Sequence, residues 1–172
     1  GIDLIADCVY DLVLHNDIQL VILGKGEARY ERFFRELQEC FPGKVRALMT
    51  YDRELSKRIY AATDIFLMPS RSEPCGLSQM IASRYGAIPV VRETGGLYDS
   101  IKPYWQENGV IHGNGFTFAN YSAAELKERT EAAIALYNEP QLRKEFVKRI
   151  MKTDFSWGAS ARSYLELYNS IG

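Results

Sequence analysis

Residues 65–79 read Ile-Phe-Leu-Met-Pro-Ser-Arg-Ser-Glu-Pro-Cys-Gly-Leu-Ser-Gln. The run Ile65–Met68 is short and apolar and stops at Pro69, which is typical of a buried strand. A polar loop follows, and the pattern then predicts a helix over 76–85 with a glycine at its end. A strand that leads through a loop into a helix is half of a βαβ unit. The stretch therefore predicts an α/β fold with a parallel sheet.

The rest of the chain repeats this alternation. Short apolar runs predict further strands at 19–23, 45–50, 88–91 and 115–118. Apolar residues at helical spacing predict helices over 4–13, 30–37, 52–62, 97–104, 122–138, from 140 onward and over 159–171. We therefore expect a parallel sheet that helices cover on both faces.

Composition narrows the class of protein. The 172 residues suit one domain, and 21 basic against 22 acidic residues give a net charge of −1. We therefore expect no nucleic-acid partner and no membrane surface as partner. No apolar run approaches the roughly 20 residues of a membrane span. The first residues, Gly-Ile-Asp, already lie in a helical pattern, so we expect no signal peptide and interpret the sequence as a piece of a longer protein.

The three cysteines predict neither a disulfide framework nor a zinc site. Cys8, Cys40 and Cys75 lie 32 and 35 residues apart, which is not a metal-ligand spacing. We expect a reducing, cytoplasmic compartment and no metal. Cys8 and Cys40 are expected in the core.

The loop at 69–79 has the residues that an anion site needs. In open parallel sheets, ligands bind beyond the carboxyl ends of the strands, at helix N-termini. Gly76 leaves room for a ligand near the backbone, and Ser78 offers a hydroxyl. Glu73 precedes the helix and is placed to reach another part of the same ligand. A purely structural turn is the open alternative.

A second loop, 92–97, also joins a predicted strand to a helix. It contains Thr94, Gly95 and Gly96, and paired glycines expose backbone N–H groups. Two such loops on successive βα units are suited to adjacent phosphates. A glycine-rich turn without a ligand is again the open alternative.

Other candidates carry weaker signals. Gly24–Glu27 lacks the third glycine of the dinucleotide fingerprint, because Arg29 stands there, and this argues against a nicotinamide cofactor. Tyr51 follows a predicted strand, where an aromatic ring can stack on a base or simply pack. The histidines His15 and His112 have no ligand-spaced partners, and Trp157 is expected to anchor the last helix.

Several segments resemble the family of bacterial glycogen synthases and plant starch synthases. The resemblance runs over essentially all 172 residues. Its specific signals are Glu-Pro-Cys-Gly-Leu at 73–77, Tyr-Gly-x-x-Pro-Val-Val at 85–91, and Thr-Gly-Gly-Leu at 94–97, in this order. The segments 51–64 and 154–157 also resemble the family.

The resemblance implies a fold and an activity. The family has two Rossmann-like αβα domains that face a cleft, the GT-B arrangement. It transfers glucose from a nucleotide sugar, usually ADP-glucose, to the non-reducing end of an α-1,4-glucan, with retention at the anomeric carbon and without a metal or other cofactor. This chain looks like the C-terminal nucleotide-binding domain alone, over 1–172. Its implied partners are the nucleotide sugar, the α-1,4-glucan and the N-terminal domain.

The resemblance also assigns roles to residues. Glu73 matches the donor-site glutamate that contacts the transferred glucose and stabilises the oxocarbenium-like charge at its anomeric carbon. Tyr51 matches the aromatic residue that stacks on adenine. The positions that match the loops around the sugar and the phosphates are Cys75, Gly76, Leu77, Ser78, Thr94, Gly95 and Gly96.

Some positions depart from the family pattern. Ser72 stands where many members have Phe, and Ile81 stands where related transferases have a second Glu. The family's phosphate-binding Arg and Lys lie in a Ser-Arg-Leu…Gln-Lys-Gly stretch whose Gly is matched by Gly1. We therefore expect the first strand, both cations and the N-terminal domain to lie upstream, and the isolated chain to be inactive.

Three alternatives remain open from the sequence. A sibling GT-B transferase would use UDP-glucose or another sugar nucleotide, and the sequence does not separate it from an ADP-glucose enzyme. A nicotinamide-dependent oxidoreductase is disfavoured by the incomplete glycine motif. A non-catalytic glucan-binding module is disfavoured because no paired tryptophans are present.

Overall fold

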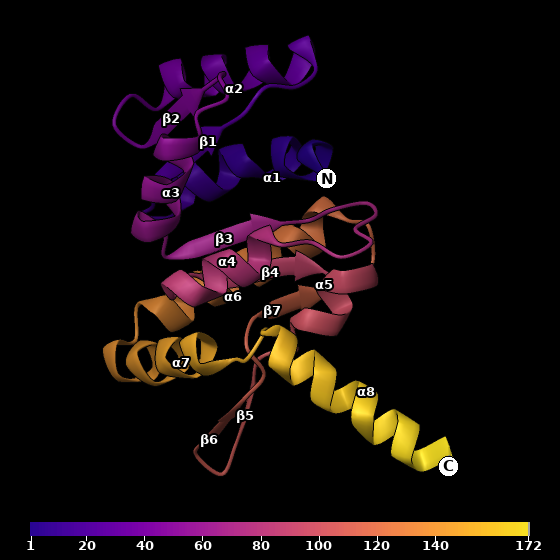
Figure 1. Cartoon of the computed structure of the whole chain (residues 1–172). Coiled ribbons are helices and arrows are strands. Elements are labelled where there is room, and N and C mark those ends of the chain that lie inside the picture. Colours follow the sequence, from indigo (N-terminus) through magenta and orange to yellow (C-terminus); the bar gives the residue numbers. More distant parts are fainter. Residues whose placement is uncertain (172) are drawn as a thin grey trace.

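The computed structural model describes residues 1–171 and has the predicted alternation of strands and helices (Figure 1). The helices are α1 (Ile2–His15), α2 (Ala28–Cys40), α3 (Arg53–Ala62), α4 (Ser78–Tyr85), α5 (Gly95–Ser100), α6 (Ala123–Tyr137), α7 (Pro140–Lys152) and α8 (Trp157–Ile171). The strands are β1 (Leu20–Leu23), β2 (Val45–Leu48), β3 (Ile65–Met68), β4 (Ile88–Arg92), β5 (Trp105–Glu107), β6 (Val110–His112) and β7 (Phe116–Phe118).

The parallel strands form two separate groups. β1 pairs with β2, and β4 lies between β3 and β7, all in parallel register. Among residues 1–171, no ladder joins β1 to β3, so each of these strands has an unpaired edge. The expectation of a parallel α/β fold is confirmed, but the sheet is divided.

Helix α1 connects the two groups because it is apolar on two faces. Leu4, Cys8 and Leu12 pack in the core over β4 and β7, together with α6 and α7. Val9 and Val13 pack in a second core under β1, β2 and α2. Figure 1 shows α1 between the two strand groups. The central strand β4 is buried from Ile88 to Val91, whereas β1 and β3 are only partly buried.

Local signals set the helix ends. The Asp52 carboxylate accepts a hydrogen bond from the Leu55 amide at 2.9 Å, as an N-cap does. Ser122 caps α6 through Glu125, although at 3.4 Å. Helix α4 ends at Gly86, whose φ of 91° is left-handed.

The structure corrects several predicted boundaries. Helix α4 begins at Ser78 rather than at residue 76, because Gly76 has a φ of 75° that no helix contains. The helix predicted over 97–104 is α5, which starts at Gly95 and ends at Ser100, where the chain turns to extended backbone. The second strand ends two residues early, at Leu48, and the last helix begins two residues early, at Trp157.

The β5–β6 hairpin was not predicted. Its turn is Asn108-Gly109, with φ of 49° and 79°. This dipeptide is the strongest short hairpin signal, because both central residues of the turn need positive φ. The sequence therefore held the signal, but the flanking strands are only three residues long.

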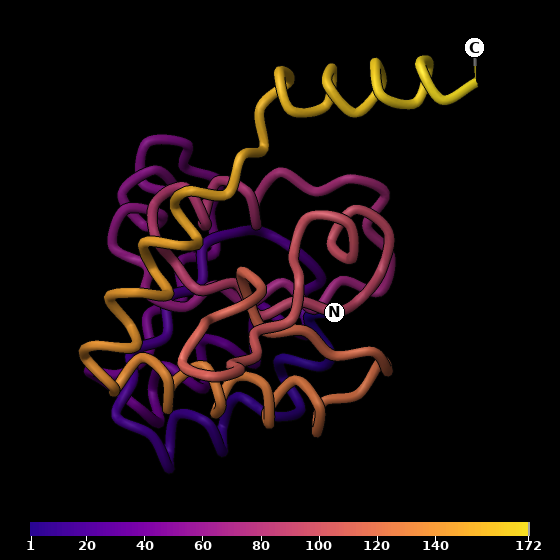
Figure 2. The backbone as a smooth tube through the Cα atoms, turned by 90° about the horizontal axis from the view of Figure 1, so that it is seen from below, coloured from indigo at the N-terminus to yellow at the C-terminus, as the bar shows by residue number. Residues whose placement is uncertain are grey.

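Two predictions about packing, the core position of Cys40 and the anchoring role of Trp157, are wrong. Cys8 is buried as expected, but Cys40 is exposed at the end of α2. Trp157 is 91% exposed and anchors nothing within residues 1–171. Figure 2 shows why: α8 leaves the body of the domain and extends away from it. None of the helices described has both the length and the apolar character that a bilayer span requires.

Candidate functional site

The two loops singled out by their glycines lie side by side. Strands β3 and β4 are adjacent and parallel, so the loops that follow them leave the same end of the sheet. The Gly96 amide donates a hydrogen bond to the Glu73 carbonyl at 3.0 Å. The structure thus brings the 70–78 loop and the 93–96 loop into direct main-chain contact.

This contact requires glycine at both positions of the second loop. A Cβ atom on Gly95 would lie 2.2 Å from the Glu73 carbonyl oxygen. A Cβ atom on Gly96 would lie 2.0 Å from the Cys75 carbonyl oxygen. Both distances are far inside van der Waals contact, and the obstructing atoms are backbone. The glycine pair therefore serves close packing of one loop on the other.

The side chain of Gln79 connects the two loops through hydrogen bonds. Its side chain is fully buried, and Nε2 donates to the Gly76 carbonyl at 2.9 Å and to the Cys75 carbonyl at 3.3 Å. The same nitrogen lies 3.1 Å from the Ser100 hydroxyl, which itself donates to the Gly96 carbonyl at 2.6 Å. This set of bonds fixes the amide orientation, because three acceptors surround one nitrogen. Oε1 is buried and has no partner among residues 1–171.

Two helix N-termini open at this place. Helix α4 begins at Ser78 and α5 begins at Gly95, directly after the two loops. Neither N-cap residue, Leu77 or Thr94, makes a side-chain capping hydrogen bond. The backbone N–H groups of both first turns therefore lack the usual side-chain partner. In α5 the Gly96 amide bonds to the Glu73 carbonyl and the Leu97 amide to the Thr94 carbonyl, so the first N–H groups of α4 and the Gly95 N–H are the ones suited to an anion.

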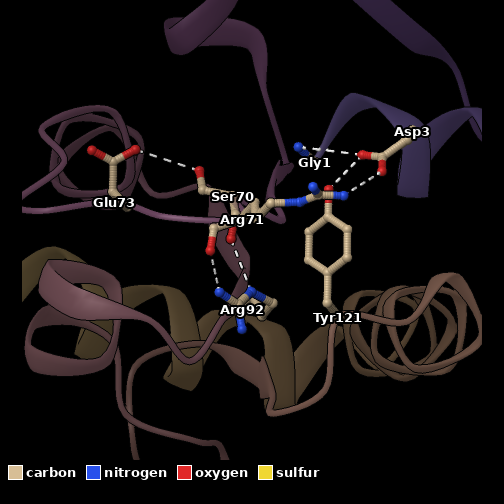
Figure 3. A network of polar contacts seen from close by, with 7 residues as sticks. All are labelled: Gly1, Asp3, Ser70, Arg71, Glu73, Arg92 and Tyr121. Carbon is tan, nitrogen blue, oxygen red and sulfur yellow. Dashed lines mark hydrogen bonds and ion pairs between the residues drawn. The ribbon is translucent and has the colours of Figure 1, made fainter.

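Glu73 is the acidic residue of the first loop. It is half-buried, and its Oε2 atom lies 3.4 Å from the Ser70 hydroxyl, a long hydrogen bond (Figure 3). Its backbone carbonyl is the acceptor for Gly96 described above. The position of this carboxylate therefore depends on both loops.

An arginine network holds the start of the first loop (Figure 3). Arg92, at the end of β4, donates through Nε to the Ser70 carbonyl at 2.9 Å and through a terminal nitrogen to the Arg71 carbonyl. The Arg71 guanidinium lies 4.6 Å from the centre of the Tyr121 ring and 3.4 Å from an Asp3 carboxylate oxygen. The loop is thereby tied to β4, to α1 and to the segment before α6.

The electrostatics of this network centre on Asp3. The Tyr121 hydroxyl donates to its Oδ1 at 2.5 Å, and this hydrogen bond lowers the pKa of Asp3. Burial, and then the bond to Asp3, raise the pKa of Tyr121. The contact with Tyr121 also raises the pKa of Arg71. Arg71 is therefore a fixed cation beside the candidate site.

The other predicted residues lie as follows. Cys75 and Leu77 are exposed on the first loop, while Ser78 and Thr94 are partly buried. Tyr51 is 82% exposed at the carboxyl end of β2, in the other strand group. The structure brings the two glycine loops together but forms no described hydrogen bond between them and Tyr51.

The site also contains residues that the sequence interpretation missed. Each of them contacts a residue that lies more than 15 residues away in the sequence. They are Gln79, Ser100, Arg92 and Tyr121. No local pattern marks such contacts. Within the part of the chain that is described, no group of three or more His, Cys, Asp or Glu side chains is arranged for a metal ion.

Comparison with known proteins assigns the family. The model of the family "Glycosyl transferases group 1" matches residues 1–153. The chain belongs to this family of glycosyltransferases.

Individual relatives agree with this assignment. The chain is 46% identical over 171 residues to the glycogen synthase of Bacillus subtilis and 49% identical over 171 residues to that of Kosmotoga olearia. Each match covers 99% of this chain and 35% of the relative. The chain therefore spans about a third of the length of these relatives.

A solved structure is similar in fold and sequence. The catalytic domain of starch synthase IV from Arabidopsis thaliana, bound to ADP and acarbose, matches 99% of this glycosyltransferase chain with a TM-score of 0.81 and 37% identity. The match covers 35% of that chain. The resemblance to glycogen and starch synthases and the Rossmann-like GT-B lobe are thus confirmed.

Proposed function

We propose that this chain is the nucleotide-sugar-binding lobe of a glycogen or starch synthase, and that the longer enzyme transfers glucose from ADP-glucose to the non-reducing end of an α-1,4-glucan. One observation carries the proposal: two glycine loops meet at two helix N-termini in a chain of this glycosyltransferase family. The names of its relatives support the choice of sugar and acceptor.

The helix N-termini are proposed to bind the donor diphosphate. The first N–H groups of α4 and the Gly95 N–H at the start of α5 offer partial positive charge to an anion, and this needs no metal or other cofactor. The hydroxyls of Ser78 and Thr94 add donors to the same phosphates. The other residues of the two loops would line the site around the sugar and the phosphates. They are Cys75, Gly76, Leu77, Gly95 and Gly96.

Glu73 is proposed to act on the transferred glucose. In the reaction, the bond from the anomeric carbon to the diphosphate oxygen breaks and ADP leaves with the electron pair. The acceptor 4-oxygen bonds to that carbon, and its proton passes to the departing phosphate. Positive charge develops at the anomeric carbon as the first bond breaks. The Glu73 backbone is held by the second loop and its carboxylate accepts from Ser70, so the carboxylate is placed to stabilise this charge.

Tyr51 is proposed to stack on the adenine of the donor. Its ring is 82% exposed, so one face is available to a base. It belongs to the strand pair β1–β2, and the donor would therefore bridge the two strand groups.

The divided sheet supports a further part of the proposal. An upstream strand would pair with the unpaired edges of β1 and β3, and helix α1 would then be its crossover to β1. This strand would carry the Arg and Lys that bind the phosphates in the family. A preceding domain would provide the acceptor site, so we expect no transfer by the 172-residue chain alone. Three unpaired cysteines within residues 1–171 support a cytoplasmic location.

Calorimetry with ADP tests the binding site. Gly96→Ala would place its Cβ atom 2.0 Å from the Cys75 carbonyl oxygen and push the two loops apart. We expect this variant to bind ADP at least tenfold more weakly. Gly26→Ala is the matched control, because a Cβ atom there meets nothing within 4 Å. Unchanged ADP affinity in a folded Gly96→Ala variant would contradict the proposed site, and tighter binding of UDP than of ADP would favour the sibling transferase.

A further inference from the structure

The β5–β6 hairpin presents a pair of stacked aromatic rings at the edge of the domain. Trp105 and His112 are direct cross-strand partners, with ring centroids 3.8 Å apart and ring planes inclined by 9°. Trp105 is 47% exposed, although an apolar ring of this size usually packs against the core. The hairpin projects beyond β7, between α7 and α8, and does not contain any residue of the candidate donor site (Figure 1).

The base of this hairpin is rigid. Asn114 is buried, accepts a hydrogen bond from the Lys102 amide at 2.6 Å and donates one to the Ser100 carbonyl at 2.9 Å. Gly113, with a φ of 72°, is so close to the segment before β5 that a Cβ atom would lie 2.0 Å from the Pro103 carbonyl oxygen. The aromatic pair is therefore held in place before any ligand arrives, which lowers the entropy that binding would cost.

The same two rings line an open cavity of about 900 Å³. The other walls come from α7 and from the end of α5, and they offer charges of both signs. Carboxylates belong to Asp99, Glu145 and Asp154, and cations belong to Lys102, Lys148, Arg149 and Lys152. Arg149 is fixed through its Nε atom, which donates to the Gly113 carbonyl at 2.6 Å. A cavity of this size is within the range of sites that bind small molecules.

The chemistry of the walls indicates the class of ligand. A pyranose ring has an apolar face of C–H groups that packs on a flat aromatic ring, and a rim of hydroxyls that both donate and accept hydrogen bonds. The carboxylates accept hydrogen bonds from such hydroxyls, and the ammonium and guanidinium groups donate hydrogen bonds to them. Charges of mixed sign favour a neutral, polyhydroxylated ligand over a strongly charged one.

We propose that Trp105, stacked on His112, is the platform of a second glucan-binding site, which holds a chain of the acceptor polysaccharide outside the donor site. The inference rests on the proposed function for the identity of the ligand. Its role is to keep the protein on the polysaccharide between transfers, since two weak attachments to one polymer raise the effective concentration of the chain ends.

Native gel electrophoresis in gels that contain glycogen tests the proposal, together with calorimetry using maltoheptaose. We expect glycogen to retard the chain and Trp105→Ala to weaken glycogen and maltoheptaose binding at least tenfold. Trp105→Phe keeps an aromatic platform and is expected to stay within about threefold of the parent. Trp157→Ala is the matched control, because this second tryptophan is 91% exposed and does not line the cavity.

A second variant keeps the test informative if Trp105→Ala does not fold. Glu145→Ala removes an exposed carboxylate from the wall, and we expect it to weaken maltoheptaose binding severalfold with an unchanged melting temperature. Glycogen binding that is the same in the parent and in both variants, or no binding of glycogen by the parent, would overturn the proposal.

ADP binding separates this proposal from the proposed function. We expect Trp105→Ala to bind ADP as the parent does. If the chain binds glycogen through Trp105 but does not bind ADP, the proposed donor site fails and the glucan site stands. If ADP binds but Trp105 has no effect on glycogen, the glucan site fails and the donor site stands.

Discussion

Gln79 is the residue on which the geometry of the two glycine loops most depends. The two N–H groups of its buried amide are shared among the carbonyls of Gly76 and Cys75 and the hydroxyl of Ser100. We expect Gln79→Leu, which has a similar volume but no donor, to lower the free energy of unfolding by about 2 kcal/mol, because buried carbonyls lose their partner. ADP affinity should fall as well, since the loops are no longer held together.

Urea unfolding and ADP calorimetry check this prediction. Gln141→Leu makes the same chemical change at an exposed position of α7 and should alter neither quantity. Ser100→Ala removes the hydroxyl that links Gln79 to Gly96. The losses in the free energy of unfolding from Gln79→Leu and Ser100→Ala should therefore not add in the double variant. Additive losses would show that Gln79 and Ser100 act separately.

Asp3 makes part of the stability dependent on pH. Its pKa is lowered, chiefly by the hydrogen bond from Tyr121, so the folded state favours the carboxylate. The stabilisation is present above the ordinary pKa of 3.8 and is lost as the pH falls through the lowered value. We expect Asp3→Asn to cost about 1 kcal/mol at pH 7, a reduced figure because the side chain is 36% exposed.

Unfolding by urea at pH 7, 5, 4 and 3 measures the effect. The difference between the parent and Asp3→Asn should shrink steadily below pH 5. Asp17→Asn, at an exposed position without a hydrogen bond or ion pair within residues 1–171, should show no such trend. A difference that stays constant down to pH 3 would rule out the carboxylate as its source.

At this scale, sequence could predict residues that act through their own backbone but not those that act through distant partners. Gly95 and Gly96 are visible as a pair, and Glu73 is visible beside a glycine. Tyr121 lies 118 residues from Asp3, and no spacing rule connects them. Cys40 was assigned to the core from its apolar neighbours, but it ends its helix on the solvent side.

Among the elements, strands β1 and β3 each have one edge without a hydrogen-bonded partner strand within residues 1–171. Val21 of β1 is 47% exposed, and every residue of β3 is only partly buried, although both strands are wholly apolar. An added upstream strand would cover these side chains and pair both edges. We expect a longer version of the protein that includes this strand to melt at least about 5 °C higher, because each kcal/mol is worth about 2–4 °C in a domain of this size.

Thermal unfolding and hydrogen exchange test the strand. Amides on the facing edges of β1 and β3 should become protected in the longer version. A control extension of the same length with a scrambled sequence should give neither effect. Equal melting temperatures and equal exchange in both versions would contradict the proposal.

Sequence predicted the strands of the parallel groups and the helices, but it missed the β5–β6 hairpin at the edge of the domain. Strands β3, β4 and β7 and the helices around them have strong apolar periodicity, because they form the main core. The β5–β6 hairpin has little buried surface, so no apolar pattern marks it. Helix α8 was predicted as amphipathic and is, but the structure leaves its apolar face uncovered, with Tyr164, Leu165 and Tyr168 each at least 60% exposed.

At the scale of the whole molecule, the chain is one lobe with its two glycine loops at one end of the parallel strands β3 and β4, where we propose the donor site. The division of the sheet was not predictable from the pattern of strands, because that pattern does not show which strands pair with each other. The family resemblance alone indicated it. The whole-molecule account therefore depends on Glu73 and the two loops working within a longer enzyme.

Transfer of radiolabelled glucose from ADP-glucose to glycogen by the longer enzyme is the most direct test of that account. We expect Glu73→Ala to lower kcat at least 100-fold with little change in ADP affinity, because the carboxylate acts on charge that develops during the reaction. Glu128→Ala, an exposed glutamate on α6, serves as the control and should retain full activity. Turnover by Glu73→Ala close to that of the parent would contradict the central claim.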